Sequence, residues 1–312
     1  MRVVFLGSAG FACASLERLL TLDGVEVAGV VTQPDRPQGR NLAVAACPVK
    51  QLVASRRIHV LTPERVNAPE ALAALRALAP DLLVVVAYGQ LLRRELLDLP
   101  PLGCINVHAS LLPKYRGAAP IVWAVAGGET TSGVTTMRMN ERMDAGEILL
   151  QCSEPVEAGD TGGSLHDRLA ITGAALLAET LRELERGTLR GRPQDETQAT
   201  LAPKLNKSDG RLDWRRTAVE LERRVRAFNP RPVCFSLLPD GGTLRVWQAS
   251  VEESASGARP GQVLDVGGGE GPLVAAATGA LRLRTVQPGG RRAMGGAEFL
   301  RGHPLTVGTV LA

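Results

Sequence analysis

The first 190 residues alternate short β-branched apolar runs with longer stretches whose apolar residues recur at helical spacing. Strands that alternate with helices imply a mostly parallel sheet with helices on both faces. Residues 82–87 are apolar without alternation, as expected of a central parallel strand. The pattern therefore predicts a Rossmann-like α/β domain. The expected strands are residues 3–7, 25–32, 58–61, 82–87, 104–108, 133–139 and 148–154, and the expected helices are residues 12–22, 49–56, 69–78, 94–97 and 120–126.

The size and composition of the chain are those of a globular protein with two domains. At 312 residues it is about twice the usual length of one domain. Its hydrophobic fraction of 45% and charged fraction of 22% exclude an intrinsically disordered chain. No apolar run approaches the roughly 18 residues of a membrane span, and the opening apolar stretch is too short for a signal peptide. We therefore expect a cytoplasmic protein without a membrane segment.

The pattern changes after a long helix that is expected to run to Arg186, with Ser164 and Asp167 as a capping box at its start. Residues 191–209 are rich in proline and polar side chains and are expected to form an extended linker. A second capped helix then begins at Thr217. Five short runs separated by glycines predict a small β-barrel of the oligonucleotide-binding (OB-like) type. The expected domains are 1–190, the linker 191–209 and the barrel domain 210–312, with barrel strands at 234–238, 243–251, 262–266, 273–277 and 280–286.

The positive charge of the chain is concentrated in its last third. From Lys204 onward there are 16 lysines and arginines against 10 acidic residues, whereas the preceding part is slightly acidic. This imbalance favours contact between the C-terminal part and a polyanion such as nucleic acid. Aromatic residues make up only 3% of the chain, so we expect that contact to be electrostatic rather than a stacking platform. The alternative explanation is a compositional bias towards arginine throughout the chain.

The fifth predicted strand, residues 104–108, carries the strongest candidates for catalysis. Asn106 and His108 are two residues apart, so both side chains lie on one side of the strand near its carboxyl end. An amide and an imidazole can both donate hydrogen bonds to a carbonyl oxygen that becomes an oxyanion. Asp144 follows the sixth strand and could support a charged imidazole. These residue types are suited to acyl transfer, although an isolated histidine in a strand is more often structural.

Two other classes of enzyme are disfavoured by missing motifs. The turn after the first strand, Gly7 to Gly10, lacks the Gly-x-Gly-x-x-Gly spacing of dinucleotide-binding proteins. No Gly-x-Ser-x-Gly nucleophile is present either, which favours direct transfer over a covalent intermediate. The five cysteines are scattered, without a Cys-x-x-Cys pair, so we expect neither a metal nor a disulfide framework.

The block around these candidates resembles the signature of the folate-dependent formyltransferases. It reads GCINVHASLLPKYRGAAPI over residues 103–121. The similarity extends over essentially the whole chain and includes residues 32–40, 84–89, 194–197 and 226–230. The resemblance implies that Asn106, His108 and Asp144 are the catalytic residues. It further implies folate contacts from Val86, Ala87, Tyr88 and Gly89 and from Ser110, Leu111, Leu112 and Pro113.

The resemblance also implies a reaction and its partners. The expected reaction transfers the formyl group of 10-formyltetrahydrofolate, a co-substrate, to the α-amino group of methionine on initiator tRNA for translation initiation. The expected tRNA contacts are Arg36 and Arg40 in the first domain and Lys204 and Lys207 in the linker. A monomer is expected. Residues 41–46 are apolar where the family usually has basic residues. Ala9 and Gly10 replace the family's usual proline and acid, so no ligand role is expected of Ala9 or Gly10.

Two alternatives remain open at this point. The same three catalytic residues would serve a formyltransferase acting on a small amine, such as an amino sugar nucleotide or glycinamide ribonucleotide. The second domain argues against the glycinamide enzyme, and the loop at residues 33–40 argues against the sugar enzyme. A protein that binds RNA without catalysing a reaction is a third possibility, and it would bind tRNA without any turnover.

Overall fold

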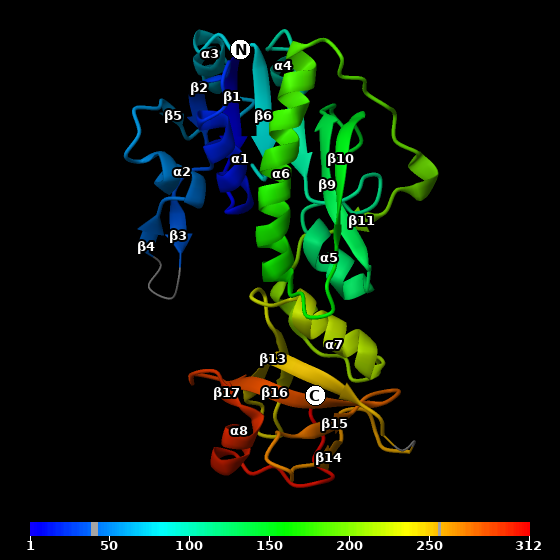
Figure 1. Cartoon of the computed structure of the whole chain (residues 1–312). Helices are drawn as coiled ribbons and strands as arrows, with labels where there is room; N and C mark the ends of the chain where they lie inside the picture. Colours follow the sequence, from blue (N-terminus) through cyan, green and yellow to red (C-terminus); the bar gives the residue numbers. More distant parts are fainter. Residues whose placement is uncertain (39–42, 255–256) are drawn as a thin grey trace. The chain divides into compact units, whose positions relative to one another are not determined.

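The computed structural model describes residues 1–38, 43–254 and 257–312, and these residues form two compact units (Figure 1). Unit 1 consists of residues 1–120, 131–155 and 166–202. Unit 2 consists of residues 121–130, 156–165 and 203–312. The chain therefore passes from one unit to the other several times.

Unit 1 is built on a seven-stranded sheet, which confirms the predicted α/β architecture. The strand order is β10-β9-β7-β6-β1-β2-β5. The strands β7, β6, β1, β2 and β5 are parallel to one another. Strand β9 is antiparallel to both of its neighbours, β7 and β10. The strands are β1 (Arg2–Gly7), β2 (Glu26–Val31), β5 (Val60–Leu61), β6 (Leu82–Val86), β7 (Cys104–His108), β9 (Thr131–Arg138) and β10 (Ile148–Pro155).

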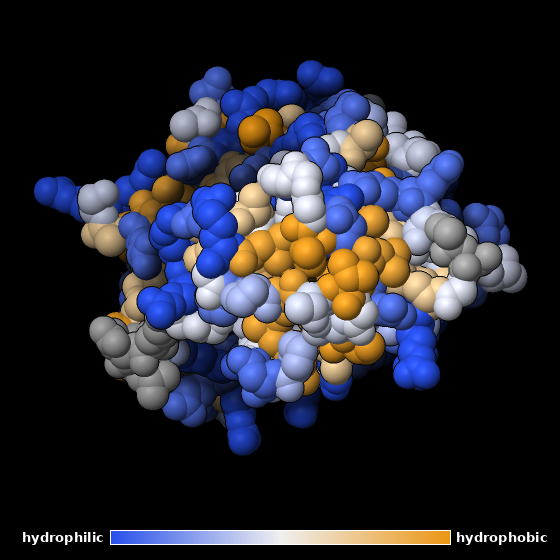
Figure 2. All heavy atoms as spheres, turned by 90° about the horizontal axis from the view of Figure 1, so that it is seen from below, coloured by the Kyte–Doolittle hydropathy of each residue, from blue (hydrophilic) through white to orange (hydrophobic). Residues whose placement is uncertain are grey.

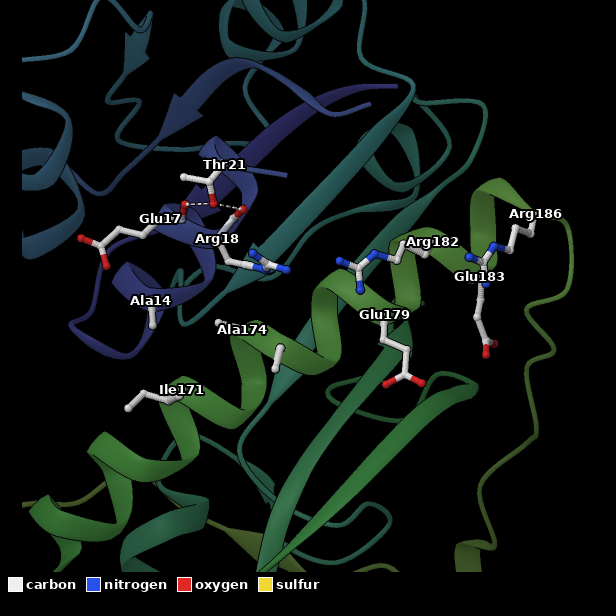
Figure 3. A pocket seen from close by; sticks show the side chains of 11 residues that line it. Ala14, Glu17, Arg18, Thr21, Ile171, Ala174, Glu179, Arg182, Glu183 and Arg186 are labelled. Carbon is white, nitrogen blue, oxygen red and sulfur yellow. Dashed lines mark hydrogen bonds between the residues drawn. The ribbon is translucent and has the colours of Figure 1, made fainter. Parts of the chain in front are cut away.

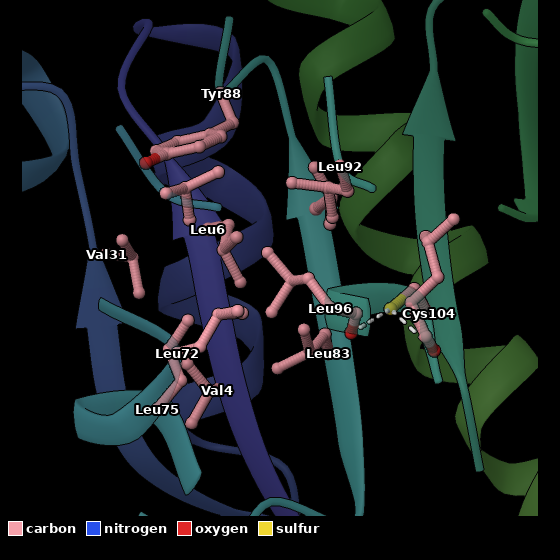
Figure 4. Packing of buried hydrophobic residues seen from close by; sticks show 13 residues of the cluster. Val4, Leu6, Val31, Leu72, Leu75, Leu83, Tyr88, Leu92, Leu96 and Cys104 are labelled. Carbon is pink, nitrogen blue, oxygen red and sulfur yellow. Dashed lines mark hydrogen bonds between the residues drawn. The ribbon is translucent and has the colours of Figure 1, made fainter. Parts of the chain in front are cut away.

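Strand β6 lies between β1 and β7, and all five of its residues are buried. Its uninterrupted apolar sequence therefore reflects helices on both faces of the sheet. One face packs on α3 (Pro69–Ala77) and α4 (Arg94–Leu97) through a cluster that includes Val4, Leu83 and Leu96 (Figure 4). On the other face lies α6 (Gly162–Glu185), in which a Cβ added at Gly173 would lie 3.1 Å from Val107 Cγ1. The remaining helices of this region are α1 (Phe11–Leu20), α2 (Pro48–Val53) and α5 (Pro120–Gly127), of which α5 belongs almost wholly to unit 2.

Helix α6 begins earlier than the sequence predicts. Its cap is formed by Thr161, whose Oγ1 accepts a hydrogen bond from Ser164 N at 3.0 Å, while Ser164 Oγ accepts one from Thr161 N at 3.0 Å. The capping box is thus Thr161–Ser164, and the prediction of Ser164–Asp167 is wrong by three residues. Serine serves here at the N3 position, where the usual pattern has Glu or Gln.

Residues 191–202, expected to be part of a linker, lie within unit 1 and are bonded to it. Strand β11 (Leu201–Ala202) pairs in parallel with β8 (Arg116–Gly117), and a short 3₁₀ helix, η1 (Glu196–Gln198), precedes it. Unit 2 takes over at Pro203, where the second 3₁₀ helix is η2 (Lys207–Gly210). Elsewhere in unit 1, β3 (Arg36–Gln38) and β4 (Ala43–Ala45) pair as an antiparallel hairpin.

Unit 2 contains the predicted barrel. The capping box of Thr217 and Glu220 begins α7 (Ala218–Ala227) as expected. The antiparallel sheet has the order β12-β13-β16-β15-β14, with β17 beside β16. Its elements are β12 (Cys234–Leu237), β13 (Thr243–Glu252), β14 (Val263–Asp265), β15 (Leu273–Ala275), β16 (Ala280–Pro288), β17 (Met294–Gly295) and the following α8 (Gly296–Gly302).

The barrel is closed by residues 308–312, which connect its two edge strands. Leu237 and Ala312 exchange two backbone hydrogen bonds of 2.7 and 3.0 Å on the β12 side. On the β14 side, Val263 N donates to Thr309 O at 2.7 Å and Leu311 N to Gly261 O at 2.8 Å. The closing segment was not predicted, because it is too short to show a strand pattern.

The surface of the chain is mixed. Seen from below, apolar side chains gather near the middle of the face, with polar side chains around them (Figure 2). Among the described residues, no helix is both long enough and apolar enough to cross a membrane.

We predict that the closing segment contributes directly to the stability of unit 2. Leu311 is 2% exposed, whereas its neighbour Val310 is 47% exposed. Leu311→Ala should lower the free energy of unfolding by about 2–5 kcal/mol because it empties a buried site. Val310→Ala, the matched control, should change it by less than about 0.5 kcal/mol. Urea unfolding of both variants measures the difference, and equal effects would mean that the segment does not close a core.

Candidate active site

Three side chains of β7 form a row that leads from the apolar core to the carboxyl end of the strand. Cys104 lies in the core cluster, and Asn106 and His108 follow at every second position on the same face. Asn106 is the register partner of Val85 on β6, and His108 lies opposite Thr135 on β9. Asn106 is 9% exposed and His108 6%. The sequence prediction that both polar side chains share one side of the strand is therefore confirmed.

The imidazole of His108 lies between two hydrogen-bond acceptors. Its Nε2 is 2.9 Å from the carbonyl oxygen of Tyr115, and its Nδ1 is 3.6 Å from Asp144 Oδ2. A carbonyl oxygen can only accept, so Nε2 carries a proton and donates it in this arrangement. A charged imidazolium would present an N–H to each acceptor. The structure thus brings Asp144 to His108, as its position after the sixth predicted strand suggested.

Asp144 occupies a left-handed backbone conformation, with φ of 50°. Such a conformation is unfavourable for a residue with a side chain and is found where the surroundings hold it. Its carboxylate accepts a hydrogen bond from Gly117 N at 2.8 Å. Two residues later, a Cβ added at Gly146 would lie only 1.7 Å from Arg138 O. The Asp-x-Gly segment is therefore a tight turn that needs glycine at its third position.

Asn106 is the one member of the cluster whose side chain is not engaged. Across the described ranges 1–38, 43–254 and 257–312, no other residue makes a hydrogen bond to its amide, although the residue is largely buried. The amide atoms of Asn106 are not among the described buried polar atoms that lack a partner, so solvent reaches them at the end of the strand. We infer that the amide is available to a ligand at the end of β7.

A family model described as "Formyl transferase" matches residues 1–181, and a model described as "Formyl transferase, C-terminal domain" matches residues 204–304. The first model alone spans more than half of the chain. The chain belongs to the formyl transferase family.

Curated relatives of this formyl transferase share almost its full length. The protein named methionyl-tRNA formyltransferase from Desulfotalea psychrophila is 46% identical over 311 residues, which cover 100% of this chain and 95% of the relative. A protein of the same name from Pseudomonas fluorescens strain SBW25 is 48% identical, with 100% of this chain and 97% of the relative covered.

Solved structures with low sequence identity share the fold. HypX from Aquifex aeolicus in complex with tetrahydrofolic acid matches 96% of this chain and 47% of its own, with a TM-score of 0.60 and 20% identity. WlaRD, described as a sugar 3N-formyl transferase, matches 94% of this chain and 99% of its own, with a TM-score of 0.67 and 15% identity. At such identities these likenesses establish the fold alone.

In the formyl transferase, the segment after β6 presents alternate residues to solvent. Ala87 and Gly89 are exposed and have left-handed φ values of 46° and 90°, whereas Val86 and Tyr88 are buried. The loop after β1 holds this segment, because Ser8 N and Ala9 N lie 3.3 and 3.4 Å from Ala87 O. Of the residues expected to contact folate here, only Ala87 and Gly89 are accessible.

The tyrosine of this segment is a core residue. Tyr88 is 2% exposed, and its ring lies among the apolar side chains near Leu6 and Val31 (Figure 4). Its hydroxyl is buried and has no hydrogen-bond partner among the described residues. Burial raises the pKa of the Tyr88 phenol to about 12. Any contact of this residue with a ligand would come from its backbone, whose carbonyl accepts from Gln33 Nε2 at 3.3 Å.

The segment from Ser110 to Pro113 is held by hydrogen bonds to Thr135 and Gln151, two residues that the sequence analysis did not identify. Thr135 Oγ1 donates to Ser110 O at 2.7 Å and accepts from Leu112 N at 3.1 Å. Gln151 Nε2 donates to Leu112 O at 2.9 Å. Ser110 and Leu112 are buried, and Leu111 and Pro113 are partly exposed. No local pattern marks Thr135 or Gln151, because their role depends on strand pairing.

The predicted tRNA contacts lie in different parts of the chain. Arg36 is exposed on β3, where its Nη2 lies 3.4 Å from Gln33 Oε1. Arg40 lies outside the described residues. Lys204 and Lys207 are exposed in unit 2, and neither forms an ion pair with another described residue.

One hollow of unit 1 lies away from this cluster. It measures about 890 Å³ and lies between α1 and α6, where Ala14, Arg18, Ile171 and Arg182 are among the residues that line it (Figure 3). None of the residues that line it belongs to the β7 cluster. Within the described part of the chain, no three His, Cys, Asp or Glu side chains are grouped so as to hold a metal ion. We place the site by its chemistry rather than by cavity volume.

We predict that Tyr88→Phe makes the stability of the protein less sensitive to alkaline pH. The phenol of the unfolded chain ionises near pH 10, and that of the folded chain near pH 12. The stability that depends on neutral Tyr88 is therefore fully present below pH 10 and is lost as the pH rises through 12. Urea unfolding between pH 8 and 11.5 should show a smaller decrease for Tyr88→Phe than for the natural protein. Parallel curves would mean that the phenol is solvated.

Proposed function

We propose that this formyl transferase moves the formyl group of 10-formyltetrahydrofolate to the α-amino group of methionine on initiator tRNA, in the cytoplasm, at the start of translation. The observation that carries the proposal is the unengaged amide of Asn106 beside the His108–Asp144 pair. The names of the relatives that match the whole chain support the choice of acceptor. The sugar formyltransferases share only the fold, so a small amine is not favoured as the acceptor.

The reaction needs little help to produce its nucleophile. An α-amino group has a reference pKa of about 8, so a useful fraction is neutral near pH 7. The neutral nitrogen attacks the formyl carbon, and the carbonyl oxygen becomes an oxyanion. Collapse of this intermediate breaks the bond to the folate nitrogen, which takes up a proton, while the amine loses one. The protein must therefore stabilise an oxyanion and allow a proton to move.

Asn106 and His108 are the donors for the oxyanion in this proposal. The Asn106 amide can donate without breaking a hydrogen bond within the protein. His108 would exchange its bond to the Tyr115 carbonyl for one to the substrate oxygen. Asp144 stabilises the charged form of His108 and lies where it can assist transfer of the proton from the amine to the folate nitrogen.

The accessible backbone after β6 fits a planar heterocycle. Ala87 and Gly89 present exposed backbone and almost no side chain to solvent. Close approach of a ligand to backbone is a usual reason for small residues in strained conformations. We propose that these two residues and the partly exposed Leu111 and Pro113 bind the folate.

The cations of unit 2 divide into two groups. Arg282 is 8% exposed and donates to both Glu252 and Asp265, and its hydrogen bonds hold the pKa of each carboxyl below its usual value. We assign this network to the stability of the barrel. Arg211 and Arg245, by contrast, form no ion pair with any residue the structure describes in unit 2 or elsewhere.

These two arginines flank β12: Arg245 lies on β13, and Arg211 directly follows η2. Phe235 on β12 is paired with Arg245 on β13 on one side and with Arg211 on the other. Directly paired residues share a face of the sheet, so both guanidinium groups belong to the outer face of the barrel. We propose that Arg211 and Arg245, with Lys204 and Lys207, bind tRNA phosphates.

We predict that Asn106→Ala and His108→Ala each lower turnover by about 100-fold or more, because losing one oxyanion donor costs about 3 kcal/mol of transition-state stabilisation. Formylmethionine formed on initiator tRNA measures the rate, and urea unfolding checks that each variant is folded. Near-normal turnover in a folded variant would remove that residue from the site. An equal rate with a small amine in place of the tRNA would contradict the proposed acceptor.

We predict that Arg245→Ala weakens tRNA binding. It should also make the slope of log K against log salt shallower by about one, as expected for the loss of one phosphate contact. Arg215→Ala is the matched control, because Arg215 is equally part of unit 2 but is paired with Asp213 at 2.8 Å. Its slope should match that of the natural protein. Affinity measured at four salt concentrations compares the three proteins. An unchanged slope for Arg245→Ala would show that its positive charge does not contact phosphate.

A further inference from the structure

Residues 192–202, here called the strap, are bonded along their length to the loops on either side of His108. Arg192 and Ile148 exchange two backbone hydrogen bonds of 2.8 and 2.9 Å in an antiparallel bridge. Two residues further along the strap, antiparallel register places Gln194 beside Gly146. The strap therefore begins by pairing with the segment that contains Asp144.

The side chain of Gln194 uses all of its hydrogen-bonding capacity at this point. Its Nε2 donates to the backbone carbonyls of Asp144 and Gly146, both at 2.8 Å. Its Oε1 accepts from Arg116 Nη2 at 2.8 Å and from Nε at 3.0 Å. An amide can make two bonds on each side, so Gln194 has none left for substrate.

The two residues next to each other on β8 complete this arrangement. Arg116 holds the acceptor side of Gln194, and the N–H of Gly117 donates to the Asp144 carboxylate. Asp144 is thus fixed at its side chain by β8 and at its carbonyl by Gln194. These contacts hold Asp144 in its left-handed conformation, which aspartate adopts more readily than most residues with a side chain.

The other end of the strap holds the second partner of His108. Thr200 Oγ1 accepts from Tyr115 N at 2.8 Å, and Thr200 O accepts from Arg116 N at 2.8 Å. The Tyr115 carbonyl is the acceptor for His108 Nε2. Both acceptors that face the imidazole ring are therefore positioned from one segment of the chain.

We propose that Gln194 is a positioning residue, which acts on the reaction by holding Asp144 against His108. The proposal rests on the catalytic role of His108 and Asp144 proposed above. Gln194 touches neither reacting atoms nor substrate in this account. Its effect should accordingly fall on the chemical step and leave substrate binding largely unchanged.

The decisive variant is Gln194→Glu, because a carboxylate keeps the acceptors for Arg116 but loses both donors to the turn at Asp144. We expect kcat to fall by about 10- to 100-fold, as for a misplacement of about 1 Å at a catalytic group. KM for the folate and for the tRNA should stay within about twofold. Gln198→Ala is the control, because the Gln198 side chain bonds to Asp195 within the strap and should leave kcat unchanged.

A double-mutant cycle separates positioning from a general loss of stability. In an Asp144→Asn background, Gln194→Glu should lower kcat by less than about threefold, because its target is already lost. If the fold-decreases in kcat of the two single variants instead multiply in the double variant, the two residues act independently and the proposal is overturned. A near-normal kcat for Gln194→Glu would also overturn it, since that result would limit Gln194 to pairing with Arg116.

A measurement without substrate keeps this test independent of the proposed reaction. The chain has four histidines, so the ring ¹⁵N resonances of His108 can be assigned by substitution. Gln194→Glu should move the Nδ1 resonance of His108, and Gln198→Ala should not. Unmoved resonances would overturn the positioning role even in an active enzyme. If the resonance moves in Gln194→Glu but the natural protein formylates no tRNA, only the proposed function is rejected.

Discussion

The parallel pairing of β6 with β7 is the constraint on which the site depends. Both strands are buried along their whole length, so polar side chains can reach a ligand only where the strands end. Asn106 is paired with Val85, at the place along the two strands where apolar side chains end and polar side chains begin. A shift of one residue in the register would turn both Asn106 and His108 towards α6. The apolar sequence of β6 thus fixes where the chemistry can take place.

The sequence was sufficient to predict what depends on local pattern. The run at residues 82–87, the row of Asn106 and His108 and the cap at Thr217 all follow from periodicity and residue type, and the structure confirms each. The contacts of Gln194, Thr135 and Gln151 could not be predicted, because they join segments that are 16 to 78 residues apart in the sequence. Such contacts follow from the completed topology and leave no local signal. The cap at Thr161 was missed for a different reason, since serine stands where the capping box usually has Glu or Gln.

Charge counting showed the same limit. The excess of lysine and arginine in the last third did not distinguish cations that stabilise the barrel from those that are available. Arg282 is enclosed by Glu252 and Asp265, whereas Arg245 has no such neighbour among the described residues. The low aromatic fraction likewise did not reveal that Phe235 lies partly exposed, paired with an arginine on each side. A net charge describes a domain, whereas recognition depends on which charges remain unpaired.

The closure of the barrel by residues 308–312 has a consequence for the order of folding. Leu237 on β12 pairs with Thr243 on one side, but its partner on the other side is Ala312, 75 residues later. Until residues 308–312 have left the ribosome, the edges of β12 and β14 that they cover are open to pairing with another chain. Contacts of such long sequence separation also form slowly. A nascent chain should therefore be most prone to aggregate in the interval between synthesis of β12 and release of the closing segment.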